Sequence, residues 1–294
     1  MHIFVTGATG WVGSVLVPEL ISAGHHVVGL ARTDAAAVSL VAAGAEPHLG
    51  SLQDLESLRT GAAAADAVVH LGFVHDFSDI PGSCETDRKA IEAMGEALAG
   101  THKPLVITSG TLGLALGQVA TETDGFDSKS PFGHRAAGAQ AALALVDRGV
   151  RVSIVRLPPT VHGKGDHGFI PRLVDLAREK GVSGFVGDGA NRWPAVHRVD
   201  AAHLFRLAVE KAPAGAVLHG VAEEGVLARE IADAIGKRLG VEVASKPANH
   251  FGFLGFAFGA DNPTSSLITR EMLGWKPTEP GLLADIATEY DIKA

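Results

Sequence analysis

A glycine-rich segment close to the start of the chain constrains the fold more than any other feature. Residues 6–13 read TGATGWVG and follow an apolar segment, His2–Thr6, whose pattern predicts a buried strand. In such a segment Gly7 permits a tight turn, Gly10 lets a phosphate group approach the backbone, and Gly13 lets the next helix pack close to the sheet. A strand, a glycine turn and a helix in this order predict a dinucleotide-binding fold of Rossmann type.

The first half of the chain continues as an alternation of short apolar segments and amphipathic segments. The further strands that this pattern predicts are His26–Ala31, Ala45–Leu49, Asp66–Leu71, Pro104–Thr108 and Arg151–Leu157, and the helices are Val12–Ala23, Asp34–Ala43, Leu52–Thr60, Glu85–Ala99 and His134–Arg148. Strands that alternate with helices predict an α/β fold with a doubly wound parallel sheet. Because such a sheet binds ligands beyond the carboxyl ends of its strands, the residues directly after the strands are the candidates for the site.

The pattern changes after Pro158, where Gly, Pro and His residues gather. Helices are predicted at Phe169–Lys180, Ala201–Lys211 and Leu227–Leu239, with short strands near Gly184–Val186, Val217–Gly220 and Val241–Ser245. A chain of 294 residues has room for one large domain and a smaller lobe. We interpret residues 1–157 as the Rossmann domain and residues 158–294 mainly as a smaller, mixed substrate-binding lobe, partly interleaved with the main sheet.

Composition argues against several classes of protein. The net charge is −8 and Lys and Arg form no run, so nucleic acid is not an expected partner. The most apolar late stretch, Phe251–Phe258, is far shorter than the roughly 20 residues that a membrane-spanning helix needs. Cys84 is the only cysteine, which excludes an intrachain disulfide and a cysteine-based metal site. With no signal-peptide pattern at the start, we expect a cytoplasmic protein.

The end of the second predicted strand bears on which dinucleotide binds. An NAD site usually has Asp or Glu there, about 20 residues after the glycine loop, to bind the ribose hydroxyls. This chain has Ala31 followed by Arg32, and a guanidinium suits a 2′-phosphate by charge and geometry. Asp34 is a partial objection, because its carboxylate could turn back toward the ribose. We therefore expect NADP(H) as the cofactor, with NAD(H) as the alternative.

The other expected cofactor contacts lie in the glycine loop or directly after strands. The full set is Thr6, Gly7, Thr9, Gly10, Trp11, Val12, Gly13, Arg32, Thr33, Ser51, Leu52, Leu71, Gly72, Phe73, Thr108 and Pro158. Ser51 and Leu52 are expected beside the adenine, and Pro158 beside the nicotinamide.

Four segments follow the glycine loop in a recognisable order. They are ITSG (107–110), VRLPPTVHG (155–163), HRVDAAHL (197–204) and LGWKP (273–277). Together with the loop they resemble the extended short-chain dehydrogenase/reductase superfamily, in its NAD-dependent epimerase/dehydratase branch. The resemblance covers nearly the whole chain, and LGWKP and VRLPP are its more specific parts.

The resemblance implies a Tyr-x-x-x-Lys pair that this chain lacks. In the family the Tyr is the general acid/base, and the Lys lowers the pKa of the Tyr and holds the ribose. Phe132 and Ala136 occupy these two positions, and the only Tyr in the chain is Tyr290. The usual serine falls near Ser109, Gly110 or Thr111. The chain therefore resembles an atypical member of the superfamily, in which another group must supply the proton.

Four residues are candidates for catalysis. The hydroxyls of Ser109 and Thr111 could polarise a carbonyl group, or they could only cap backbone groups. His134 lies within the altered motif, where the alternative is a solvated helix residue. His162, in the loop after the sixth strand, could donate a proton or could only order that loop.

Phe132, His167, Trp193 and His197 are candidates for contact with substrate, and core packing is the alternative for Trp193. His162 and His167 do not predict a metal site, since their spacing on a glycine-rich loop is not a known ligand pattern and zinc usually needs a third strong ligand. Asp200 is expected to cap the helix that follows it.

These residues predict an NADP(H)-dependent oxidoreductase that reduces a small, mostly apolar carbonyl compound with a non-standard acid. One alternative is a regulatory protein that senses NADP(H) without turnover, and another is a sugar-nucleotide epimerase or dehydratase. The expected partner is a small-molecule substrate. The resemblance also implies a homodimer through the helices next to the fourth and fifth strands.

Overall fold

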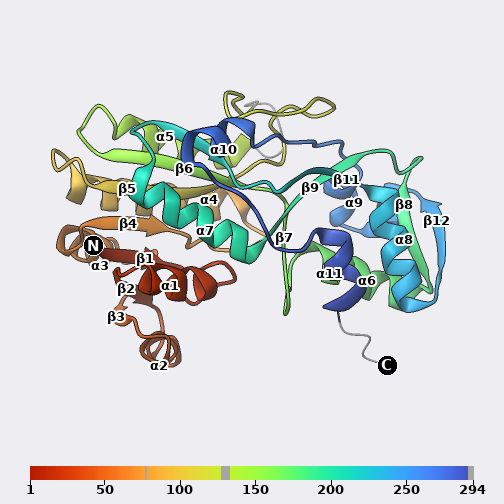
Figure 1. Ribbon diagram of the computed structural model, residues 1–294, viewed down its shortest axis with the longest axis horizontal. Coiled ribbons are helices and arrows are strands. Elements are labelled where there is room, and N and C mark those ends of the chain that lie inside the picture. The colour runs from red at the N-terminus through yellow and green to blue at the C-terminus, as the bar shows by residue number, and fades with distance from the viewer. Residues whose placement is uncertain (77, 127–132, 291–294) are drawn as a thin grey trace.

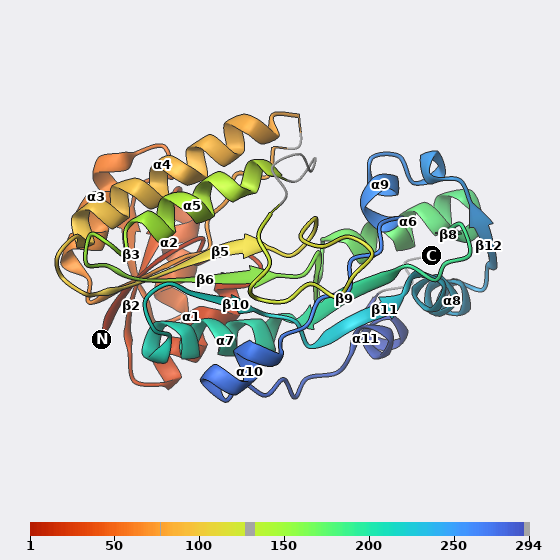
Figure 2. The same cartoon turned by 90° about the horizontal axis from the view of Figure 1, so that it is seen from above.

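The computed structural model describes residues 1–76, 78–126 and 133–290, apart from the side chain of His134. Its main sheet has seven strands, all parallel, in the order β10-β6-β5-β4-β1-β2-β3 (Figures 1 and 2). The strands are β1 (His2–Thr6), β2 (His26–Ala31), β3 (Glu46–Leu49), β4 (Ala67–His70), β5 (Pro104–Gly110), β6 (Arg151–Leu157) and β10 (Ala216–His219). The strand order reverses between β1 and β4, which is where a doubly wound sheet binds its ligands. The predicted fold class is confirmed.

Helices cover both faces of this sheet. One face carries α3 (Leu55–Ala64), α4 (Ile80–Leu98) and α5 (Ala136–Ala144), and the other carries α1 (Gly13–Ser22), α2 (Asp34–Ala42) and α7 (Arg198–Lys211). Apart from the edge strand β3, whose residues are mostly exposed, the strands bury aliphatic residues on both faces and read as nearly continuous apolar runs.

A second group of elements lies beyond the carboxyl ends of the main strands, on the right of Figure 1. It contains a three-stranded sheet of β7 (Thr160–His162), β9 (Arg192–His197) and β11 (Glu223–Leu227), and a pair formed by β8 (Val182–Val186) and β12 (Glu242–Lys246). Its helices are α6 (Phe169–Lys180), α8 (Ala228–Leu239), α9 (Leu254–Phe258) and α11 (Leu282–Thr288), with the short helix η2 (Ala248–Phe251). These elements have a core of their own.

The remaining helices belong to the main sheet. α10 (Leu267–Leu273) packs beside β10, and η1 (Gly133–Arg135) precedes α5. Although β10 lies beyond residue 158, it extends the main sheet beside β6. The division of the chain at residue 157 stays a prediction.

Several element boundaries differ from the sequence expectation for local reasons. α4 begins at Ile80 rather than Glu85, because Asp79 accepts a hydrogen bond from the Gly82 N–H and caps a first turn that contains Pro and Gly. α3 is shifted toward Ala64, since its cap is Asp54. The strands β7, β9 and β11 were not predicted. None of the described helices is long and apolar enough to cross a membrane.

The expected cap of α7 is wrong. α7 begins at Arg198, and the side chain of His197 accepts a hydrogen bond from the Val199 N–H. Asp200 lies inside the first turn, where its carboxylate accepts hydrogen bonds from the N–H groups of Thr278 and Glu279. The Asp200 carboxylate therefore binds the segment at Thr278 and Glu279 instead of capping the start of α7.

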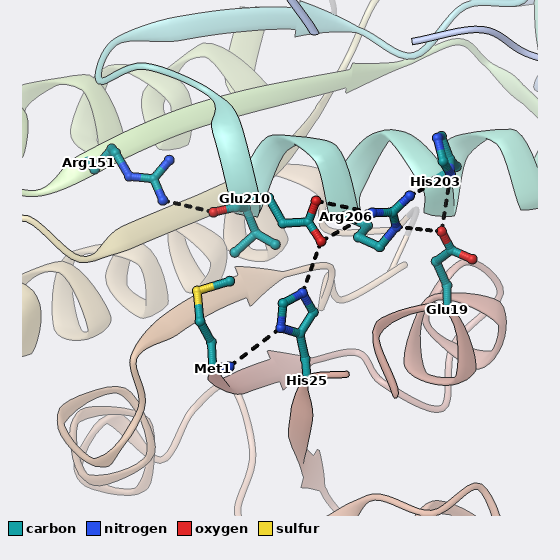
Figure 3. Close-up of polar contacts among 8 residues, drawn as sticks. Met1, Glu19, His25, Arg151, His203, Arg206 and Glu210 are labelled. Atoms are coloured by element: carbon teal, nitrogen blue, oxygen red, sulfur yellow. Dashed lines mark hydrogen bonds and ion pairs between the residues drawn. The ribbon is translucent and has the colours of Figure 1, made fainter. Parts of the chain in front are cut away.

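α1 and α7 run side by side in the same direction, joined by a charged cluster (Figure 3). Arg206 of α7 donates hydrogen bonds to Glu19 of α1 and to Glu210 one turn further along its own helix. His203 contacts Glu19, and His25, just after α1, contacts Glu210. The early part of α1 therefore lies beside the early part of α7.

Candidate functional site: the glycine loop and the strand ends

The glycine loop has the close backbone packing that its sequence predicts. Gly7 has a φ of +66°, and a Cβ atom there would lie 2.7 Å from the backbone nitrogen of Gly72. A Cβ atom on Gly13 would lie 2.1 Å from the carbonyl oxygen of Gly7. Val12, which precedes α1, makes no side-chain capping hydrogen bond. The N–H groups of Ser14 and Val15 already donate to the backbone oxygens of Gly10 and Val12, whereas those of Trp11, Val12 and Gly13 have no backbone acceptor within the described residues. These three N–H groups are the natural donors for a phosphate, and the loop fits the diphosphate of a dinucleotide.

A chain of buried hydrogen bonds connects the start of the glycine loop to the end of β4 and to α4. The Thr6 hydroxyl and Nδ1 of His70 are 2.6 Å apart, and Nε2 of His70 is 3.1 Å from a carboxylate oxygen of Asp87 on α4. The Gly72 N–H donates to the same Thr6 hydroxyl oxygen, over 3.1 Å. A neutral His70 with its proton on Nε2 satisfies all three contacts, because Thr6 then donates to Nδ1. His70 is 1% exposed, so it fixes the ends of β1 and β4 and does not face the cleft.

Two hydroxyls at the end of β5 are buried without a partner. Ser109 Oγ and Thr111 Oγ1 have no hydrogen bond to any described residue, and both side chains are at most 4% exposed. The neighbouring Thr108 is already used, since its hydroxyl donates to the backbone oxygen of His70. An unsatisfied buried polar group costs about 1 to 3 kcal/mol, which a ligand can recover. Ser109 and Thr111 are thus the groups best suited to bind a polar atom of a ligand.

The segment after β4 contacts η1 through an aromatic and cationic group. The guanidinium of Arg135 stacks 4.0 Å from the ring centroid of Phe73, and the His75 ring lies 5.2 Å from the Phe73 ring. Burial, followed by the charge of Arg135, lowers the pKa of His75. Sequence reasoning placed only Phe73 here, because nothing local indicates that Arg135 reaches the end of β4.

The altered Tyr-x-x-x-Lys motif is only partly described. Phe132 lies outside the described residues. The backbone of His134 forms part of η1, while its side chain lies outside the described part of the structure. Ala136 is the first residue of α5. The predicted roles of Phe132 and His134 therefore stay predictions.

β7 and the segment that follows it contact the glycine loop. Trp11 donates a 2.7 Å hydrogen bond from its indole to the backbone oxygen of Val161, and its ring makes an edge contact with His167 at 5.3 Å. Arg198, the first residue of α7, stacks 4.2 Å from the Trp11 ring centroid. His167 therefore lies beside the glycine loop, where sequence reasoning expected a substrate contact.

Trp193 is not at the cleft. Its side chain is 0% exposed, its indole donates to the Thr160 hydroxyl over 2.7 Å, and its ring packs between Phe169 and Phe258. The expectation of a substrate contact is corrected: Trp193 is a core residue of the second group of elements.

His162 and His197 belong to a second buried cluster, which α11 closes. His162 is 0% exposed, and its Nδ1 lies 2.6 Å from a carboxylate oxygen of Asp285. The His197 ring lies 5.5 Å from the His162 ring, and burial lowers the pKa of His197. Since His162 is committed to Asp285 and His197 caps α7, the geometry argues against both as groups that reach substrate. Asp285 is 123 residues from His162, so no local pattern signals the pair.

The segment after β5 makes further buried polar contacts, which the sequence did not predict. Glu122 accepts two 2.7 Å hydrogen bonds, from the N–H and the hydroxyl of Thr269. Arg156 of β6 donates to the backbone oxygen of Asp124 and contacts His219, whose pKa burial lowers to about 4. These contacts tie residues 111–126 to α10 and to the end of β6.

The other predicted cofactor residues lie along the same edge of the sheet. Arg32 is exposed directly after β2, and the Thr33 hydroxyl caps α2 by accepting from the Ala36 N–H. Ser51, Leu52, Leu71 and Gly72 are half-buried after β3 and β4, Thr9 and Gly10 are exposed in the loop, and Pro158 is buried after β6. The topology thus brings the set together, while contact with a cofactor stays a prediction. Among the described residues, no group of three or more His, Cys, Asp or Glu is placed to hold a metal.

Comparison with known proteins agrees with this geometry. The family described as "NAD dependent epimerase/dehydratase family" matches residues 3–219. A Schizosaccharomyces pombe protein, named "Uncharacterized protein C2A9.02", is 50% identical over 294 residues, covering 98% of this chain and 99% of the relative.

Two more distant relatives are also informative. A Stigmatella aurantiaca protein, named "4-hydroxy-2-methyl-3-oxo-4-farnesyl-3,4-dihydroquinoline-1-oxide ketoreductase", is 30% identical over 227 residues, covering 74% of this chain and 67% of the relative. Among solved structures, MoeE5 in complex with UDP-glucose and NAD superimposes with a TM-score of 0.78 at 23% identity, covering 99% of this chain and 97% of that one. This structural likeness shows the fold alone.

Proposed function

This chain belongs to the NAD-dependent epimerase/dehydratase family, and on that premise we propose that it is an NADP(H)-dependent oxidoreductase that reduces a small, mostly apolar carbonyl compound. The observation that carries the proposal is the pair of buried, unpartnered hydroxyls of Ser109 and Thr111 at the end of β5, close to a glycine loop that fits a dinucleotide. A pair of donors without acceptors suits a carbonyl oxygen on which negative charge develops.

The bound nicotinamide would supply the hydride to the carbonyl carbon. Ser109 and Thr111 hold the carbonyl oxygen by hydrogen bonds that strengthen as the alkoxide forms. The alkoxide still needs a proton, and the family's Tyr is replaced by Phe132. Because His162 is bound to Asp285, His134 is the proposed donor among the acids that the sequence suggests.

Arg32 supports NADP(H) over NAD(H). Its side chain is exposed directly after β2 and has no carboxylate partner within the described residues. A free guanidinium at this strand end suits a 2′-phosphate, whereas a carboxylate would repel it. The description of the family names NAD as its cofactor, and the solved structure of MoeE5 is a complex with NAD. The preference for NADP(H) is therefore a proposal about this chain.

Carbonyl reduction also fits the relative from Stigmatella aurantiaca, whose name is that of a ketoreductase. At the cleft of the present chain, Phe73 supplies apolar surface and Arg135 covers one face of its ring. We therefore propose a substrate whose ketone or aldehyde group is attached to an apolar body.

The test is oxidation of NADPH by the purified protein with a panel of ketones, aldehydes and enones. Ser109→Ala and Thr111→Val should each lower kcat by about 100-fold or more, the usual cost of losing one donor to a developing oxyanion. Ser153→Ala is the matched control: Ser153 Oγ is also buried without a partner, but it lies near the amino end of β6. This variant should keep its activity.

Tight NADPH binding without turnover on the whole panel would overturn the reductase and favour a sensor of NADP(H). A sensor must also bind NADPH and NADP⁺ with different affinities, because equal affinities shift no population. Interconversion of nucleotide sugars without net oxidation of NADPH would favour the epimerase or dehydratase alternative.

A further inference from the structure

Arg198 lies where the second group of elements meets the glycine loop, yet sequence reasoning gave it no role at the cofactor. We propose that Arg198 is a cofactor-binding residue, whose guanidinium binds the diphosphate of the dinucleotide across the ring of Trp11. The inference rests on the proposed dinucleotide site, but it does not depend on which reaction follows.

The position of Arg198 follows from the parallel packing of α1 and α7. Glu19 of α1 contacts His203 and Arg206 of α7, and His25, beyond the end of α1, contacts Glu210. The two helices are therefore parallel and begin at the same end of the molecule (Figure 1). Arg198 opens α7 next to the phosphate-binding start of α1.

The guanidinium of Arg198 is held in place but not neutralised. It stacks 4.2 Å from the ring centroid of Trp11, which itself stands in the glycine loop. In the described part of the chain, Arg198 has neither a hydrogen-bond acceptor nor a carboxylate within 4.0 Å. Arg206, two turns further along α7, pairs with both Glu19 and Glu210. The half-buried Arg198 thus keeps its N–H donors for another acceptor.

Gly163 makes room for this arrangement. A Cβ atom on Gly163 would lie 3.3 Å from Cγ of Arg198 and 2.9 Å from Nε2 of His197, and the φ of Gly163 is +142°. Any larger residue would push the stem of Arg198 away from Trp11. The absence of a side chain at Gly163 therefore leaves space for the Arg198 stem.

The chemistry of the pair matches a diphosphate. A guanidinium binds phosphate oxygens through two parallel hydrogen bonds, and the N–H groups at the start of α1 bind from the other side. Trp11 connects the glycine loop to β7 and α7, because its indole N–H donates to the backbone oxygen of Val161 and its ring stacks against Arg198. Phosphate bound here would thus join the second group of elements to the glycine loop.

Binding is measured without any reaction, by the fluorescence of tryptophan and by calorimetry with NADPH and with ADP-ribose, which has the diphosphate but no nicotinamide. Trp193 and Trp275 are both buried in packed cores, so a change on binding reports mainly on Trp11. Arg198→Met, which keeps the length of the side chain, should weaken binding of both ligands by about 10- to 100-fold. Arg198→Lys, which keeps the charge, should lose less.

Arg229→Met is the matched control, since the Arg229 guanidinium stacks on Phe185 at 4.7 Å in the second group of elements. It loses the same kind of stacking contact and should bind both ligands normally. Unchanged affinity of Arg198→Met for ADP-ribose would overturn the inference, as would an equal loss in both variants. A wild-type protein that binds ADP-ribose through Arg198 but reduces no carbonyl would contradict only the proposed function.

Discussion

At the scale of single residues, the candidate site contains two kinds of feature. These are hydroxyl groups without a hydrogen-bond partner and glycines at positions where a Cβ atom would clash with the backbone. Ser109 and Thr111 are buried without partners, and Gly7 and Gly13 have no room for a side chain. In contrast, the hydroxyls of Thr6 and Thr108 already make hydrogen bonds to His70. Hydroxyl residues at the ends of neighbouring strands thus have different roles, according to whether the fold supplies them with a hydrogen-bond partner.

Arg32 gives a prediction at this scale. Arg32→Ala should weaken NADPH binding by about 10- to 100-fold, because a charge-assisted hydrogen bond to the 2′-phosphate is lost. NADH binding should stay the same, and titration of both cofactors measures the difference. Arg59→Ala, which removes an exposed cation on α3, is the control. Equal losses for NADPH and NADH would show that Arg32 does not contact the 2′-phosphate.

At the scale of elements, the packing of α1 against α7 depends on a small charged cluster (Figure 3). Burial opposes ionisation of Glu19 and Glu210, but hydrogen bonds from Arg206 and from the two histidines outweigh it and lower the pKa of both carboxyls. A lowered pKa in the folded state means that the contribution to stability is present above the ordinary pKa of 4.5 and is lost as the pH falls.

The expected result is a pH-dependent effect of Glu19→Gln. At pH 7 the variant should lose about 0.5 to 1 kcal/mol of unfolding free energy, a small value because Glu19 is partly exposed. Below pH 4 the difference from wild type should shrink, since the native carboxyl is then protonated as well. Urea unfolding at a series of pH values measures it, with Glu96→Gln, which changes an exposed carboxylate of α4, as the control. A difference that is constant with pH would exclude a role of the Glu19 charge.

At the scale of the whole molecule, the last 35 or so residues connect parts that are far apart along the chain. The segment before α10 lies against residues 111–126 through backbone hydrogen bonds of Gly117 and Ala120, and the Trp275 indole donates to the backbone oxygen of Asp200. α11 then closes over His162 through Asp285. In Figure 2 this segment runs from α9 past the end of the main sheet and back to α11. The homodimer through α4 and α5 stays a prediction that light scattering would test.

The contact of α11 gives the prediction at this scale. Asp285→Ala should lower the free energy of unfolding by about 2 to 3 kcal/mol, because His162 is left buried with neither ring nitrogen hydrogen-bonded. Asp285→Asn, which keeps an acceptor oxygen, should lose less. Urea unfolding measures both, and identical losses would mean that cavity formation, not the hydrogen bond, decides the result.

Local patterns along the chain were sufficient for the nucleotide-binding half. The glycine loop, the ends of β2 and β6, and the parallel sheet follow from strand and helix periods, which the backbone imposes over a few residues. The loss of the catalytic Tyr is also visible in the sequence. The tertiary contacts of individual side chains could not be predicted in this way, because a histidine or tryptophan has the same local sequence pattern whether its side chain is buried or exposed. Only the tertiary structure shows that Asp285 binds His162, that Trp193 is a core residue, and that Arg198 lies over Trp11. These contacts join residues more than 20 positions apart.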